Sequence, residues 1–130
     1  MKLHGKVVAL LTLFLFVSSA FGAPPMWPGQ PKISAAYESL TIALKQVELS
    51  RSGEPKQHLA RASAQLLAAK TQLDTAKKNK GSARLEAMEQ IEVAEQEIEA
   101  AKTDSDRIDA AIVAITGAME QVTRAAKNGK

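Results

Sequence analysis

The sequence predicts an all-α protein, an antiparallel up-down-up-down four-helix bundle made of two helical hairpins. From residue 32 onward, apolar residues recur at spacings of three and four, as in amphipathic helices. Turn-forming residues interrupt this pattern at three places and leave four segments joined by short loops. After the first 22 residues the aromatic residues are Trp27 and Tyr37, and the chain has no Cys. A core of Leu, Ile, Val, Met and Ala suits closely packed helices.

Residues 1–22 have the layout of a secretory signal peptide. Two lysines precede an eleven-residue apolar core at residues 7–17, which is interrupted only by Thr12, and small residues follow it. Eleven residues of helix rise only about 16 Å, roughly half the hydrocarbon core of a bilayer, so no permanent membrane span is expected. Cleavage is expected after Ala20 or Gly22, because Pro24 should obstruct processing after Ala23. The sequence therefore predicts a periplasmic or secreted protein.

The mature chain is expected to be nearly neutral. The net charge of +3 includes Lys2 and Lys6 of the predicted signal, which leaves +1 after cleavage. This balance gives no reason to expect a nucleic-acid partner. The absence of Cys excludes thiolate catalysis, zinc-thiolate sites and iron–sulfur ligation.

Residues 23–31 hold four of the five prolines. Such a segment is not expected to be helical, and it predicts an extended, polyproline-like leader. Trp27 in this leader either packs on the bundle or forms an exposed contact, and packing is favoured. The remaining residues, 32–130, form the predicted bundle domain.

Three breaks separate the predicted helices. The first is the turn at residues 52–55, where Pro55 suits the first position of a new helix. At the second, Gly81 is expected to end one helix and Ser82 to cap the next. The third lies at residues 103–106, where aspartates favour a helix start. The predicted helices are 33–51, 55–79, 83–102 and 105–127.

Each predicted helix carries an apolar stripe, and alanine at many positions lets the helices approach closely while leaving a thin core. The stripes are Ile33, Tyr37, Leu40, Leu44 and Val47; Leu59, Ala62, Leu66, Ala69, Leu73 and Ala76; Leu85, Met88, Ile91, Ala94, Ile98 and Ala101; and Ile108, Ala111, Ile115, Met119, Val122 and Ala126. Gly117, inside the last helix, marks either a close helix contact or a local kink.

The two hairpins resemble each other in sequence. A shift of 49 residues pairs Leu59 with Ile108 and Ile42 with Ile91, among other apolar positions. Two explanations remain open, a duplicated hairpin of about 45 residues or the ordinary match of any two hairpins with seven-residue stripes.

Charge separates by helix. Residues 54–80 contain six basic and two acidic residues, whereas residues 84–102 contain six glutamates against Arg84 and Lys102. The two helices follow each other across a short loop and should lie antiparallel. We expect their opposite charges to help fix the pairing, although an exposed ion pair contributes less than about 1 kcal/mol.

The candidate metal ligands are few. His58 is the only histidine after the signal and has no second histidine nearby in sequence, so a surface position is expected for it. Glu92, Glu95 and Glu99 line one face of the third predicted helix and are weak candidates for divalent cations. A tight site would need ligands from facing helices.

The chain offers no nucleophile–base pattern and no glycine-rich phosphate loop. Met88 and Met119 belong to the apolar stripes, so haem ligation with His58 is not expected. The sequence therefore predicts neither an enzyme nor a cofactor.

Four parts of the chain share a pattern with a known family: the segment from Tyr37 to Ser50, the Ser52-Gly53-Glu54-Pro55 turn, the alanine-rich run of residues 59–77 and the second hairpin. In these parts the chain resembles the small metal-binding protein family of bacterial periplasms. The resemblance implies an exported four-helix bundle. It also implies binding of copper and other transition metals through histidines along the helices, of which His58 alone could correspond to one here. The other positions at which the resemblance implies histidines hold Lys, Gln, Glu or Ala in this chain.

These features favour an exported, non-enzymatic bundle that acts through surface contacts with a protein or an envelope component. One alternative is a weak periplasmic metal-sequestering protein that uses the glutamate row. Another is an amphipathic binder of an envelope or lipid surface, because alanine-rich helices with a thin core can open at an interface.

Overall fold

The structure, a computed structural model, describes residues 27, 29–76 and 81–128. This part of the chain is all-helical, as predicted. Its elements are α2 (Pro31–Leu49), α3 (Pro55–Thr75), α4 (Ser82–Ala101), the short 3-10 helix η1 (Ser105–Arg107) and α5 (Ile108–Asn128). The predicted signal peptide and residues 23–26 and 28 of the predicted leader lie outside the described residues.

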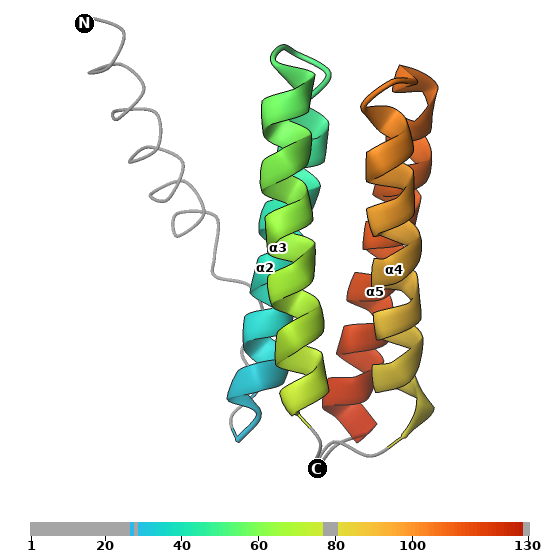
Figure 1. Ribbon diagram of the computed structural model, residues 1–130. Coiled ribbons are helices and arrows are strands. Elements are labelled where there is room, and N and C mark those ends of the chain that lie inside the picture. The colour runs from blue at the N-terminus through green and yellow to red at the C-terminus, as the bar shows by residue number, and fades with distance from the viewer. Residues whose placement is uncertain (1–26, 28, 77–80, 129–130) are drawn as a thin grey trace, which may run out of the picture.

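The four α-helices form a ring in which each helix packs against two others, in the order α2, α3, α4, α5 and back to α2. The α2–α3 loop and the α4–α5 loop lie at the same end (Figure 1). The contacts within the α2–α3 hairpin and within the α4–α5 hairpin are far more extensive than those of α3 with α4 or of α2 with α5. We call these two smaller sets of contacts the seam. The bundle therefore consists of two tight hairpins that meet at a looser seam.

Both helices of the first hairpin begin at a proline. α2 starts at Pro31, two residues before the predicted start, because proline fits the first turn of a helix where no backbone N–H is needed. The prediction that the leader stays non-helical through residue 31 is therefore wrong at Pro31. α3 starts at Pro55 as predicted and ends at Thr75, whereas the prediction extended it to residue 79. Residues 77–80 lie outside the described part.

The second hairpin has a different cap at each helix start. Gly81, at φ +125°, precedes α4 and occupies the capping position, and Ser82 is already helical. The predicted Ser82 cap is therefore wrong. At the third break, a side-chain oxygen of Asp104 accepts a hydrogen bond from the backbone N–H of Asp106 at 3.0 Å. This cap starts η1, which leads directly into α5.

Large residues and alanines alternate along the buried face of every helix. The fully buried set in α2 and α3 is Ala36, Leu40, Ala43, Val47, Leu59, Ala62, Leu66, Ala69 and Leu73. In α4 and α5 it is Ala87, Ile91, Ala94, Ile98, Ala111, Ile115, Ala118 and Val122. Most of the predicted stripe residues are in this core, which confirms the seven-residue pattern.

Leu85 is an exception to the predicted core. It is 55% exposed, and Ala83 and Ala87 are buried instead. Side chains two positions apart on a helix point about 200° away from each other. A helix that buries Ala87 therefore turns Leu85 toward the opposite face. Five other predicted positions lie at the edge of the core and are only partly buried: Tyr37, Leu44, Ala76, Met88 and Met119.

The alanines allow each hairpin to pack closely. Ala43 of α2 lies one turn from Gln46, and Ala62 of α3 lies one turn from His58. The Gln46 Oε1 and His58 Nδ1 atoms are 2.8 Å apart, so the alanine sides of α2 and α3 face each other. Small side chains there let the two helix backbones approach, and the same principle accounts for the extensive contact between α4 and α5.

The shift of 49 residues aligns the buried faces of the second helix of each hairpin, α3 and α5, but not those of the first helix of each, α2 and α4. It places buried Leu59 on buried Ile108, but it places partly buried Ile42 on buried Ile91. Buried Leu40 corresponds to Ile91 at a shift of 51 residues. The connection between the buried faces is therefore two residues shorter in the second hairpin.

Trp27 packs on the bundle, as favoured from the sequence. Its ring meets the ring of Tyr37 edge-on, with 5.7 Å between the centroids. Its backbone N–H donates to Ser34 Oγ at 2.9 Å, and its carbonyl accepts from the Gln30 N–H at 2.9 Å. These contacts place Trp27 against the first turns of α2.

Candidate functional site

His58 lies between the two helices of the first hairpin. It is partly buried on α3, whereas a surface position was expected from the sequence. Its Nδ1 lies 2.8 Å from Oε1 of Gln46 on α2, and Gln46 is buried. An amide oxygen accepts hydrogen bonds, so Nδ1 carries the proton in this contact. His58 therefore links α2 to α3.

The glutamate row of α4 is engaged with lysines. Oε1 of Glu95 is 2.9 Å from Nζ of Lys70 on α3, and Oε2 of Glu99 is 2.8 Å from Nζ of Lys102. Glu92 is exposed. A cation bound by this row would have to compete with two ammonium groups. Within the described residues, no three His, Asp or Glu side chains come together as they would around a metal ion.

Opposite charges do meet across the seam, as expected from the sequence. The Lys70–Glu95 ion pair joins α3 to α4, and both side chains are partly buried. Arg84 of α4 adds a contact that the sequence analysis did not foresee, since its Nη1 donates to the backbone oxygen of Leu73 at 2.9 Å. A cation near the last turn of α3 interacts favourably with the carbonyl end of that helix.

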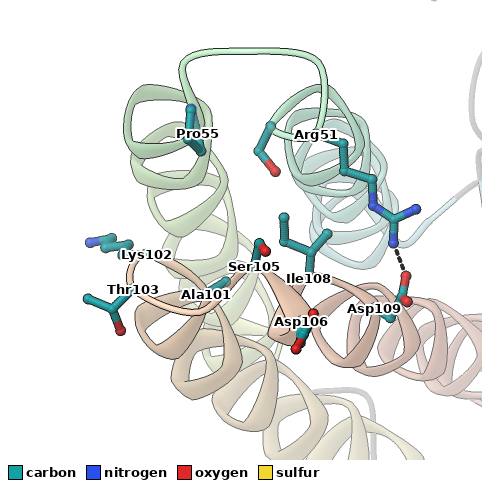
Figure 2. A pocket seen from close by; sticks show the side chains of 10 residues that line it. Arg51, Pro55, Ala101, Lys102, Thr103, Ser105, Asp106, Ile108 and Asp109 are labelled. Carbon is teal, nitrogen blue, oxygen red and sulfur yellow. Dashed lines mark ion pairs between the residues drawn. The ribbon is translucent and has the colours of Figure 1, made fainter.

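A cavity opens where the two loops approach each other (Figure 2). Its volume is about 720 Å³. The lining residues are Ser50, Arg51, Pro55, Ala101, Lys102, Thr103, Ser105, Asp106, Ile108 and Asp109. The first three belong to the α2–α3 hairpin and the rest to the α4–α5 hairpin, so the cavity lies at the seam. An ion pair between Arg51 and Asp109 bridges it.

The cavity wall combines opposite charges and hydroxyl groups. Arg51 is paired with Asp109, and Lys102 is paired with Glu99 on the preceding turn. Ile108 contributes an apolar surface that belongs to the core. Both basic side chains are thus paired, and Asp106, which is exposed, is the one lining charge without an ion pair among the described residues. This lining favours small polar guests over a strongly charged ligand.

The outer face of α4 combines exposed apolar and acidic side chains. Leu85 is 55% exposed and Val93 is 43% exposed, and Glu89 lies midway between them at four-residue spacing. Glu86 and Glu92 are also exposed on this helix. The apolar spacing of this helix predicted Leu85 in the core and so did not indicate this face.

Comparisons with protein-family models, with curated proteins and with solved structures found no match. Among the described residues, no helix has the length and apolar character needed to cross a membrane.

Proposed function

We propose that this chain is an exported, non-enzymatic bundle protein that acts through surface contacts, and that the outer face of α4 is the contact surface. The observation that carries the proposal is the exposure of Leu85 and Val93 on either side of Glu89. Large apolar side chains exposed beside carboxylates that have no ion pair among the described residues suit a partner that offers apolar and basic groups.

The partner chemistry follows from this combination. A cationic amphipathic helix would place apolar side chains on Leu85 and Val93 and lysine or arginine near Glu86, Glu89 and Glu92. Export to the periplasm or outside the cell is part of the proposal and rests on the layout of residues 1–22.

The test is fluorescence anisotropy with two labelled helical peptides, one of leucine and lysine and one of leucine and glutamate. The wild-type protein should bind the cationic peptide and not the acidic one. Glu89→Lys should abolish this binding, because it places a like charge at the centre of the contact.

Val113→Ser provides the matched control, because Val113 is an exposed apolar residue on α5. This variant should bind the cationic peptide as tightly as the wild type does. Equal binding of both peptides, or equal loss in the Val113→Ser and Glu89→Lys variants, would contradict the proposed surface.

A further inference from the structure

The two ends of the seam are built differently. At the end where α2 begins and α5 ends, Nε2 of Gln30 donates to the backbone oxygen of Ala126 at 2.8 Å. At the same end, Arg84 of α4 donates to the backbone oxygen of Leu73. We call this the terminal end. The opposite end, with the α2–α3 and α4–α5 loops, is the loop end, and there the cavity separates the hairpins.

The ion pair that crosses the loop end is exposed. The Arg51 side chain is 50% exposed and the Asp109 side chain is 81% exposed. Such a pair contributes little to the stability of the closed bundle, because water and salt screen the charges. The contacts between the hairpins are also less extensive than those inside each hairpin, and less extensively packed boundaries open at lower free energy than the remainder of a fold.

We propose that the two hairpins part at the loop end while the terminal end stays closed, so that the bundle works as a clamp. Each hairpin moves as a unit, because the contacts inside it are much more extensive than those across the seam. Opening widens the cavity and exposes Ile108, which is only 4% exposed in the closed bundle. This motion goes beyond the proposed surface function and requires no partner.

Two ion pairs cross the seam and help the shared apolar core to hold the clamp closed. Arg51–Asp109 closes the loop end, and Lys70–Glu95, which is partly buried, lies deeper along the seam. Opening at the loop end breaks the first pair before it reaches the second. The Arg51–Asp109 pair is therefore the first ion pair to break, and it contributes to the ratio of open to closed molecules together with the burial of Ile108.

The experiment measures distances between pairs of spin labels on introduced cysteines, which the cysteine-free chain makes specific. Ser52→Cys with Thr103→Cys spans the seam at the loop end. Lys32→Cys with Lys127→Cys spans the seam at the terminal end. Lys45→Cys with Arg61→Cys stays within the first hairpin. All six positions are exposed.

The loop-end pair should show a second population at longer distance, while the other two pairs show one narrow population each. Arg51→Glu should raise the ratio of open to closed molecules about two- to fivefold, the range for loss of an exposed ion pair. The charge-swapped double variant Arg51→Glu with Asp109→Arg should restore the wild-type ratio.

Arg107→Glu is the matched control. Arg107 is similarly exposed and pairs with Glu97, within the α4–α5 hairpin, at 3.4 Å. This variant should leave the loop-end distances unchanged. Raising the salt concentration on the wild-type background gives a second readout, because screening should increase the open population.

Three results would overturn the proposal. One is a loop-end distribution as narrow as that of the hairpin-internal pair and insensitive to both salt and Arg51→Glu. Another is equal broadening of all three label pairs, which would show general loosening of the bundle. The last is an equal effect of Arg107→Glu and Arg51→Glu on the loop-end distances.

Discussion

The side chain of Gln90 on α4 lies over Gly117 on α5, and a Cβ added at Gly117 would lie 3.3 Å from Oε1 of Gln90. α5 is continuous from Ile108 to Asn128. Of the two explanations for a glycine inside this helix, the structure therefore supports the close helix contact. It also shows that the atom nearest to the glycine is the movable end of a long side chain.

Gly117→Ala should stabilise the bundle by about 0.5–1 kcal/mol, because alanine costs less backbone entropy in a helix than glycine does. The Gln90 amide has to shift by only a few tenths of an ångström, which its flexible side chain allows. Thermal unfolding should show a melting temperature higher by roughly 2–6 °C. Gly117→Val should lose this gain, since a branched side chain crowds Gln90. A lower melting temperature for Gly117→Ala would show that Gln90 cannot move.

Leu66→Ala and Leu67→Ala should differ sharply although the two residues are neighbours. Leu66 is fully buried and Leu67 is 57% exposed. We expect the first change to lower the free energy of unfolding by about 3 kcal/mol and the second to change it by less than about 0.5 kcal/mol. Urea denaturation followed by circular dichroism gives both values. Equal losses would mean that the buried face of α3 is misassigned.

Glu54→Gly should stabilise the α2–α3 loop. Glu54 has φ +48°, in the left-handed region, and precedes Pro55. A side chain raises the energy of that conformation by roughly 1 kcal/mol, and glycine relieves part of it. Chemical denaturation should show a gain of up to about 1 kcal/mol. Ser52→Gly is the control and should lose stability, because Ser52 has no positive φ to relieve.

Transition metals should bind weakly. His58 is hydrogen-bonded to Gln46, and Glu95 and Glu99 are paired with lysines. Titration calorimetry with Cu²⁺ or Zn²⁺ should therefore show no Kd below about 10 μM, which corresponds to about 7 kcal/mol. Weak Ca²⁺ or Mg²⁺ association should fade as salt rises. A stoichiometric, sub-micromolar copper site that His58→Ala removes would instead support the metal-binding function implied by the family resemblance.

Protein recovered from an envelope or culture fraction should begin at Phe21 or Ala23. These are the first residues after cleavage at Ala20 or Gly22. N-terminal sequencing decides the point. A chain that is recovered from membranes and still begins at Met1 would refute the predicted signal peptide.

The helices and most of the core were predictable because local chemistry determines them. Pro55 starts α3 as expected, since proline fits the first turn and little else in a helix. The choice between Leu85 and Ala87 was not local. Both fit a plausible stripe, and the rotation of α4 against α3 and α5 decides which is buried. The spacing of apolar residues favours the larger residue, Leu85, as the buried one. Close packing of the helices instead buries the smaller residue, Ala87.

The site features depended on contacts distant in sequence. The cavity has walls from residues 50–55 and residues 101–109, and neither segment alone indicates it. The hydrogen bond of His58 to Gln46 and the bond of Arg84 to Leu73 are likewise set by helix register. Lys70–Glu95 was foreseen only as a general attraction between helices of opposite charge, because sequence gives the sign of a charge but not its partner.

The hydrogen bond between Gln30 and Ala126 brings the start of the first hairpin to the end of the last helix. The order of the hairpins along the chain is therefore not imposed by their packing. A circular permutant that begins at Gly81 and joins Asn128 to Trp27 through a short linker would keep the contacts described for α2, α3, α4 and α5. Either hairpin can thus be the one that leaves the ribosome first.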